Sequence, residues 1–170
     1  YNFAHAAGKE DFELLGLGGS GQITGTVRGP IATPVVAAHI SSRETMFNNV
    51  LLGAADIDLR YDGPRSLLTF DRALFSEGTG RLTLTGTIAF PDRGPSPRFD
   101  LVVDATNYPV DRAVKAAGLA FIVGPGHGTG RLLVTGTPDS GKTTFVNLTI
   151  TRGEARLLLA GDVVWASGEG

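Results

Sequence analysis

The sequence predicts an all-β protein: a curled antiparallel meander of about ten strands with one or two short helices, shaped as a groove or half-barrel. Three observations predict this class. The 170-residue chain contains 24 Gly, 9 Pro and no Cys, a composition typical of short strands joined by tight turns. Several segments alternate between apolar and polar residues with a period of two. A ten-residue sequence that reads as a strand recurs along the chain.

The repeated sequence organises the chain. GTGRLTLTGT begins at Gly78 and GTGRLLVTGT at Gly128, and the two differ at only two of ten positions. A shorter copy, GSGQITGT, begins at Gly19. These markers divide a single domain, residues 1–170, into sub-repeats at about 9–77, 78–108 and 109–170. The start at Tyr1 carries no initiator Met or signal pattern, so we expect a piece of a longer protein.

Period-two alternation places apolar side chains on one face of the predicted sheet and polar side chains on the other. In RLTLTGTIAF, for example, Leu82, Leu84 and Ile88 share one face while Arg81 and Thr83 point away. Other strand-like segments repeat the pattern. The apolar residues expected to line the shared face are Ile57, Leu59, Tyr61, Leu82, Leu84, Ile88, Phe90, Phe99, Leu101, Val103, Leu132, Val134, Val146, Leu148, Ile150, Leu157, Leu159, Val163 and Trp165.

A short helix is predicted at about 109–118. Pro109 suits a first helical turn, Val110 and Ala113 recur at helical spacing, and Gly118 suits a left-handed closing position. A weaker helix is expected near 9–15, and the segment before Gly78 is expected to lack one.

The segment GTPDSGKT, Gly136 to Thr143, fits the pattern of a nucleotide phosphate-binding loop. Such a loop needs a helix directly after its Lys, because the helix N-terminus holds the phosphates. Here Lys142 is followed by TTFVNLTITRG, which is β-branched and alternating and therefore predicts a strand. We interpret Gly136, Gly141, Lys142 and Thr143 as part of a hairpin turn in which Gly141 has positive φ, and nucleotide binding as a remote alternative.

Other chemistry is sparse in the sequence. His5, His39 and His127 lie on separate segments with no second ligand at a metal-binding spacing, so no metal, cofactor or catalytic residue is predicted. Ser140 and Ser167 lack the context of a nucleophile. A net charge of −2 disfavours nucleic-acid binding, and no run has the length of a membrane span.

The apolar face therefore carries the functional prediction. A packed core is the default explanation of such a face, but one or two short helices cannot cover a whole meander. The sheet must either fold over on itself or leave part of the face to a ligand or partner. An alternative is a structural module, a closed sandwich or β-helix segment that pairs with partners through its edge strands.

The stretches GTGRLLVTGTPDS, VNLTITRGEARLLLAGDV and FDLVVDATNYPVDRAVKAAGL resemble the AsmA-like and TamB family of bacterial envelope proteins. The resemblance covers nearly the whole chain, and the letters GKT are a departure that the family pattern does not require. It implies a taco-like β groove in the periplasm, within a parent protein anchored in the inner membrane.

The same resemblance implies a function and its partners. The groove would carry phospholipid acyl chains between the inner and outer membranes, or help outer-membrane proteins assemble. The expected partners are phospholipid acyl chains and an outer-membrane assembly protein bound through an edge strand. The chain is not expected to be an enzyme.

Overall fold

A computed structural model describes residues 17–47, 49–91, 96–116, 125–137 and 139–166. Within these ranges the chain forms nine strands, a short 3-10 turn and one short helix. The strands are β1 (Leu17–Arg28), β2 (Val35–Phe47), β3 (Val50–Asp62), β4 (Leu67–Glu77), β5 (Gly80–Ala89), β6 (Arg98–Pro109), β7 (His127–Gly136), β8 (Ser140–Arg152) and β9 (Ala155–Ala166). The 3-10 turn is Gly63–Arg65 and the helix is α2 (Val110–Ala116).

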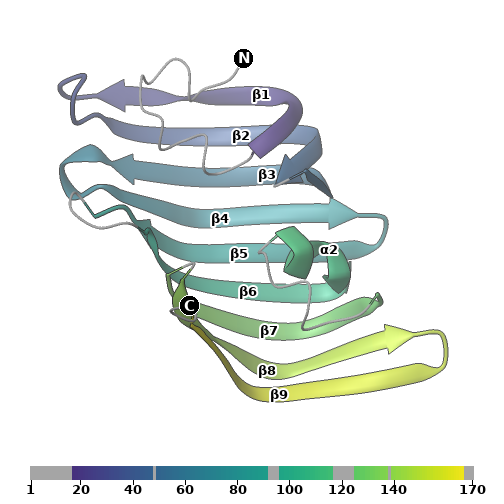
Figure 1. The fold of residues 1–170 in the computed structure, drawn as a ribbon. Coiled ribbons are helices and arrows are strands. Elements are labelled where there is room, and N and C mark those ends of the chain that lie inside the picture. The colour runs from purple at the N-terminus through teal and green to yellow at the C-terminus, as the bar shows by residue number, and fades with distance from the viewer. Residues whose placement is uncertain (1–16, 48, 92–95, 117–124, 138, 167–170) are drawn as a thin grey trace.

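All nine strands belong to one sheet, in the order in which they occur along the chain, and every neighbouring pair is antiparallel. The sheet curls but does not close into a barrel. Figure 1 shows the meander stepping from β1 to β9, with α2 lying over one face near the middle. The predicted curled meander is confirmed, whereas a closed sandwich or a β-helix is wrong for the described residues, since they form one open antiparallel sheet.

Register shifts interrupt the period-two alternation in most of the long strands. In β4 the shift lies between Phe70 and Ala73, so both side chains face inward while Asp71 and Arg72 both face outward. One extra residue on one strand is a β-bulge, which bends the strand and increases its twist. Similar register shifts occur in the pairing of β2 with β3, β6 with β7, β7 with β8 and β8 with β9. Repeated bulges therefore curl the sheet while keeping its apolar residues on the inner face.

The bulge in β8 corrects one prediction of the sequence. Phe145 pairs with Leu132 and is buried, the shift follows, and Leu148 is then inward with no exposed surface. Val146 instead pairs with Arg131 and is 39% exposed, so its expected place on the inner face is wrong. Asn147, with φ of 52°, supplies the left-handed residue that the bulge needs.

The glycines that close the repeated sequence have a structural cause. Gly86 and Gly136 occupy equivalent positions in two copies, with φ of 122° and 118°. A Cβ on Gly86 would lie 2.1 Å from the carbonyl oxygen of Asp100, and one on Gly136 would lie 2.3 Å from the Cα of Gly141. Only glycine fits where the neighbouring strand passes this closely.

The phosphate-loop letters lie on a hairpin, and the strand predicted after Lys142 is confirmed as β8. The amide of Thr137 donates to the carbonyl of Ser140 at 2.7 Å, which closes the turn between β7 and β8. The turn differs from the prediction because Gly136, rather than Gly141, has the positive φ, and Gly141 is already part of the strand.

The predicted helix at 109–118 is confirmed over the described residues Val110–Ala116. Pro109 ends β6 instead of opening the helix, since its backbone still pairs with His127 of β7. The segment before Gly78 is strand β4 and contains no helix, as expected. The weaker helix near 9–15 and the closing residue Gly118 lie outside the described residues.

The β8 bulge can be tested by comparing two aliphatic truncations. Leu148→Ala should lower the free energy of unfolding by about 2–5 kcal/mol, because it removes a fully buried side chain from the inner face. Val146→Ala should cost less than about 1 kcal/mol, because that side chain faces solvent. Urea unfolding of both variants measures the difference. Equal losses would contradict the bulged register.

Candidate functional site

The inner face of the sheet is the first candidate site, and three clusters of buried apolar residues lie on it. One occupies one end of strands β2 to β6, a second occupies the other end of the same strands, and a third lies on β7 to β9 with α2. Their buried members are Val36, Tyr61, Leu68 and Ile88 in the first; Val50, Leu52, Ala55, Ile57, Ala73, Phe75, Leu82, Ala105 and Tyr108 in the second; and Val110, Phe145, Leu148 and Ile150 in the third.

Most residues predicted to line the groove lie in or against these clusters. Those buried are Ile57, Tyr61, Leu82, Ile88, Leu148 and Ile150, and those partly buried against a cluster are Leu59, Leu84, Phe90, Phe99, Leu101, Val103, Leu132, Leu159 and Val163. Val134 is half-buried on β7 outside the clusters. Leu157 shares the inner face, because it pairs with Ile150, but it is 55% exposed on the last strand. Trp165 belongs to β9, and its side chain is outside the description.

The helix α2 covers part of the inner face. Val110 is buried with Phe145, Leu148 and Ile150, and Ala113 packs against the cluster that contains Tyr108. Val110 fits closely over β7 because residue 128 is glycine: a Cβ there would lie 2.1 Å from Val110 Cγ1. The guanidinium of Arg112 also pairs with the carboxylate of Glu77 at the end of β4.

The side chain of Tyr108 links β6 to β3 across the inner face. It rises from β6, is fully buried, and donates its hydroxyl hydrogen to the carbonyl of Leu52 on β3 at 2.6 Å. Burial raises the pKa of the Tyr108 hydroxyl, the negative charge of Glu77 raises it further, and Arg112 opposes the shift. The neutral phenol is therefore the form that the folded protein holds.

The inner face is closed in its middle and more open at its edges. On β1, Ile23 and Val27 are 47% and 64% exposed, although they pair with the inward Ile40 and Val36. On β9, Leu157 is exposed in the same way, while a Cβ added to Gly161 would meet no atom within 4 Å. Apolar inner surface is thus accessible at both edge strands.

The outer face is polar and carries cross-strand ion pairs. Arg60 binds Asp71 through two hydrogen bonds, and this guanidinium lowers the pKa of the Asp71 carboxyl. On β9, a hydrogen bond from the Thr144 hydroxyl, and secondarily Lys142, lower the pKa of Asp162. These pairs are exposed, so they orient the surface and add little stability.

The residues of the phosphate-loop pattern do not converge on one point. Lys142 points outward, with its ammonium 3.4 Å from Asp162, whereas Thr143 is buried on the inner face. A phosphate loop needs both side chains on the same phosphates and their metal ion. Neighbouring strand residues point to opposite faces, so this geometry does not support a nucleotide site.

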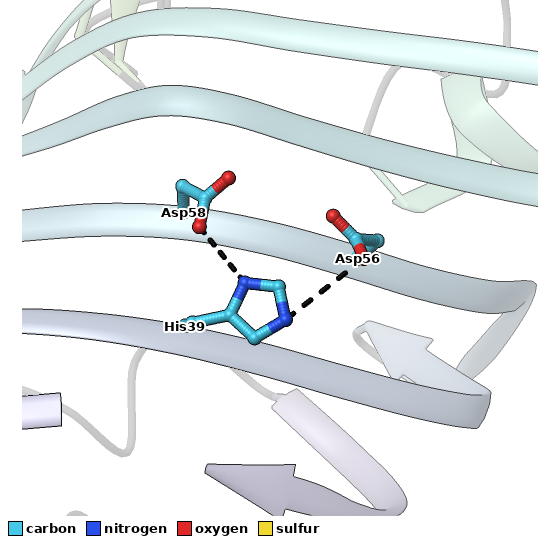
Figure 2. A group of neighbouring side chains, drawn as sticks. All are labelled: His39, Asp56 and Asp58. Carbon is cyan, nitrogen blue, oxygen red and sulfur yellow. Dashed lines mark hydrogen bonds and ion pairs between the residues drawn. The ribbon is translucent and has the colours of Figure 1, made fainter. Parts of the chain in front are cut away.

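A second cluster lies on the outer face of β2 and β3, where His39 stands between Asp56 and Asp58 (Figure 2). The sequence analysis missed this grouping because His39 is far from the two aspartates along the chain. The sequence does show two carboxylates on the same face, because Asp56 and Asp58 have D-x-D spacing on outward positions. Only the register of the hairpin places His39 directly opposite Asp58. His127 lies exposed on β7, and His5 is outside the described residues.

Comparison with protein-family models, curated proteins and solved structures finds no match for this chain. Among the described residues, no helix has the length and apolar character needed to cross a membrane.

The Tyr108 bridge predicts a specific loss of stability. Tyr108→Phe should lower the free energy of unfolding by about 1–3 kcal/mol, because the Leu52 carbonyl loses its buried donor. The raised pKa gives a second signature: the hydroxyl's contribution is complete below the ordinary tyrosine pKa of 10.0 and is lost as the pH rises above it. Chemical unfolding should therefore show a large difference in the free energy of unfolding between the wild-type protein and Tyr108→Phe at neutral pH, and a smaller difference at alkaline pH. A constant difference across that range would contradict the bridge.

Proposed function

We propose that this chain is a segment of an apolar trough that holds phospholipid acyl chains in the bacterial cell envelope. The observation that carries the proposal is the continuity of the inner face: apolar side chains follow it from β1 to β9 and stay accessible at both edge strands. The parent protein is proposed to be anchored in the inner membrane, as the resemblance to AsmA-like and TamB proteins implies.

The chemistry of the two faces suits an acyl chain. A hydrocarbon tail needs no hydrogen-bond partner and gains about 0.8 kcal/mol for each methylene group removed from water. The outer face is largely polar and ion-paired, and its exposed apolar side chains, such as Leu158 and Val164, lie beside polar groups such as Asp162. A charged headgroup would stay at the rim of the trough, because burying it without a partner is costly.

The covered middle of the trough is proposed to open by movement of α2. Leu148 and Tyr108 have no exposed surface, so an acyl chain can lie there only if the helix is displaced. The described helix is Val110–Ala116, and its contacts with the rest of the chain include Val110, Ala113, the Arg112 ion pair and the hydrogen bond from the Val110 amide to the Gly126 carbonyl. Entry would begin at the edge strands, where Leu157 and Val27 are exposed.

Adjacent leucines on β9 provide a matched test. A photoreactive side chain at Leu157, which faces inward and is 55% exposed, should crosslink to phospholipid in bacterial membrane extracts. The same group at Leu158, which is 63% exposed but faces outward, should give little adduct. Mass spectrometry of the purified protein identifies the adducts. Equal crosslinking at both positions, or none at Leu157, would argue against the trough.

A second candidate function is an interaction module that pairs through its edge strands. The observation that favours it is β9, a 12-residue edge strand on which the outward Leu158 and Val164 are 63% and 72% exposed. An exposed, apolar edge is a template for another strand. The proposed partner is an outer-membrane assembly protein that adds a strand to this edge.

Edge pairing can be tested on the isolated chain. If the edges pair, the protein should self-associate in sedimentation experiments, and Val164→Pro should abolish the association by removing a backbone donor from β9. Val164→Lys is the control that keeps the donor, and it should weaken association through its charge. Circular dichroism checks that both variants retain the sheet. A monomeric wild-type protein would contradict this module without affecting the trough proposal.

A further inference from the structure

The outer face carries a set of potential metal ligands that the register of the sheet brings together. His39 on β2 is the direct cross-strand partner of Asp58 on β3, and Asp56 lies two residues earlier on the same face. One nitrogen and one oxygen from each carboxylate lie within 4.8 Å of one another. Figure 2 shows the imidazole directed at the two aspartates from the neighbouring strand. Because strands β2 and β3 are paired along their length, the backbone holds these positions in place.

The two carboxylates divide their oxygens between His39 and Arg72. Asp58 Oδ1 lies 2.8 Å from His39 Nδ1, and Asp56 Oδ2 lies 3.9 Å from His39 Nε2. The other oxygens face β4, where Arg72 Nη2 is 2.5 Å from Asp56 Oδ1 and 3.8 Å from Asp58 Oδ2. Arg72 therefore holds Asp56 by a hydrogen bond and Asp58 by an ion pair, both from the side of β4. One oxygen of each carboxylate is left facing the imidazole. Metal-binding carboxylates are commonly held by such outer hydrogen bonds.

The charge and exposure of this patch suit a cation. Three carboxylates in this patch face two guanidinium groups: Asp56, Asp58 and Asp71 against Arg60 and Arg72. With a neutral His39, the patch has one net negative charge. The side chains of His39, Asp56 and Asp58 are 44%, 42% and 44% exposed. Water can therefore complete the coordination of an ion, and the imidazole has room to turn.

We propose that His39, Asp56 and Asp58 bind a first-row divalent transition-metal ion of the Zn²⁺ class. The imidazole turns so that one nitrogen joins the two carboxylate oxygens around the ion, and solvent fills the remaining positions. The nitrogen ligand selects against Mg²⁺ and Ca²⁺, which prefer oxygen ligands alone.

The binding experiment uses the full chain without an affinity tag and Zn²⁺ as the probe. Isothermal titration calorimetry should show one saturable site at neutral pH, and Mg²⁺ should not compete for it. His39→Ala and Asp58→Asn should each weaken binding at least about tenfold.

Two control variants are matched to the site. His127→Ala removes the other described histidine, and Asp104→Asn removes an outer-face carboxylate that pairs with Arg131 at 2.7 Å; both should bind Zn²⁺ as the wild-type protein does. Circular dichroism confirms that every variant keeps its sheet. Saturable binding that is weakened only in the His39 and Asp58 variants supports the site. Absence of saturable binding below about 1 mM, or unchanged binding in His39→Ala, would overturn it.

Discussion

The buried contact between Tyr108 and Leu52 is the constraint on which the curl of the sheet depends. The two residues lie on β6 and β3, with β4 and β5 between them along the sheet, so their hydrogen bond of 2.6 Å spans the inner face. Leu52 lies at the register shift where Met46 pairs with Leu51 and Thr45 with Gly53. The phenol thus satisfies a buried carbonyl beside a bulge, and leaving that carbonyl without a donor would cost about 1–3 kcal/mol. A flatter sheet would separate the two groups.

The curl explains how a single sheet can bury one of its own faces. Bulges in neighbouring strands bend the meander, and the side chains of β2 to β6 then contact one another across the concave side. The short helix covers the part of the inner face where Val110 meets Leu148 and Ala113 packs against the cluster that contains Tyr108. The inner face is therefore closed in the middle, as expected of a packed core. It is accessible at β1 and β9, as expected of an apolar trough.

The sequence predicted the meander because alternation and repeated glycines are local signals, whereas the bulges and the outer-face cluster depend on contacts between strands. In FVNLT, Val146 has the parity of an inward residue, and only the left-handed Asn147 marks the extra position. Asn107, with φ of 48°, marks the corresponding shift before Tyr108 on β6. The grouping of His39 with Asp58 required the register of the β2–β3 hairpin, which no pattern within either strand contains.

On the proposed function, opening the trough need not cost much free energy, because an acyl chain would replace the apolar contacts of the helix with other apolar contacts. Displacing α2 would expose Val110 and Ala113 together with the inner side chains beneath them, and a hydrocarbon tail laid on the sheet would cover that part of the surface again. The polar contacts to be broken are the pair between Arg112 and Glu77, whose side chains are 34% and 31% exposed, and the hydrogen bond from the Val110 amide to the Gly126 carbonyl at 3.1 Å. The exposed pair is worth about 1 kcal/mol and the backbone hydrogen bond about 0.5–1.5 kcal/mol, which the burial of about three methylene groups offsets. The Tyr108 bridge lies within the sheet and can remain intact, so the helix rather than the curl is the element that an entering chain would move.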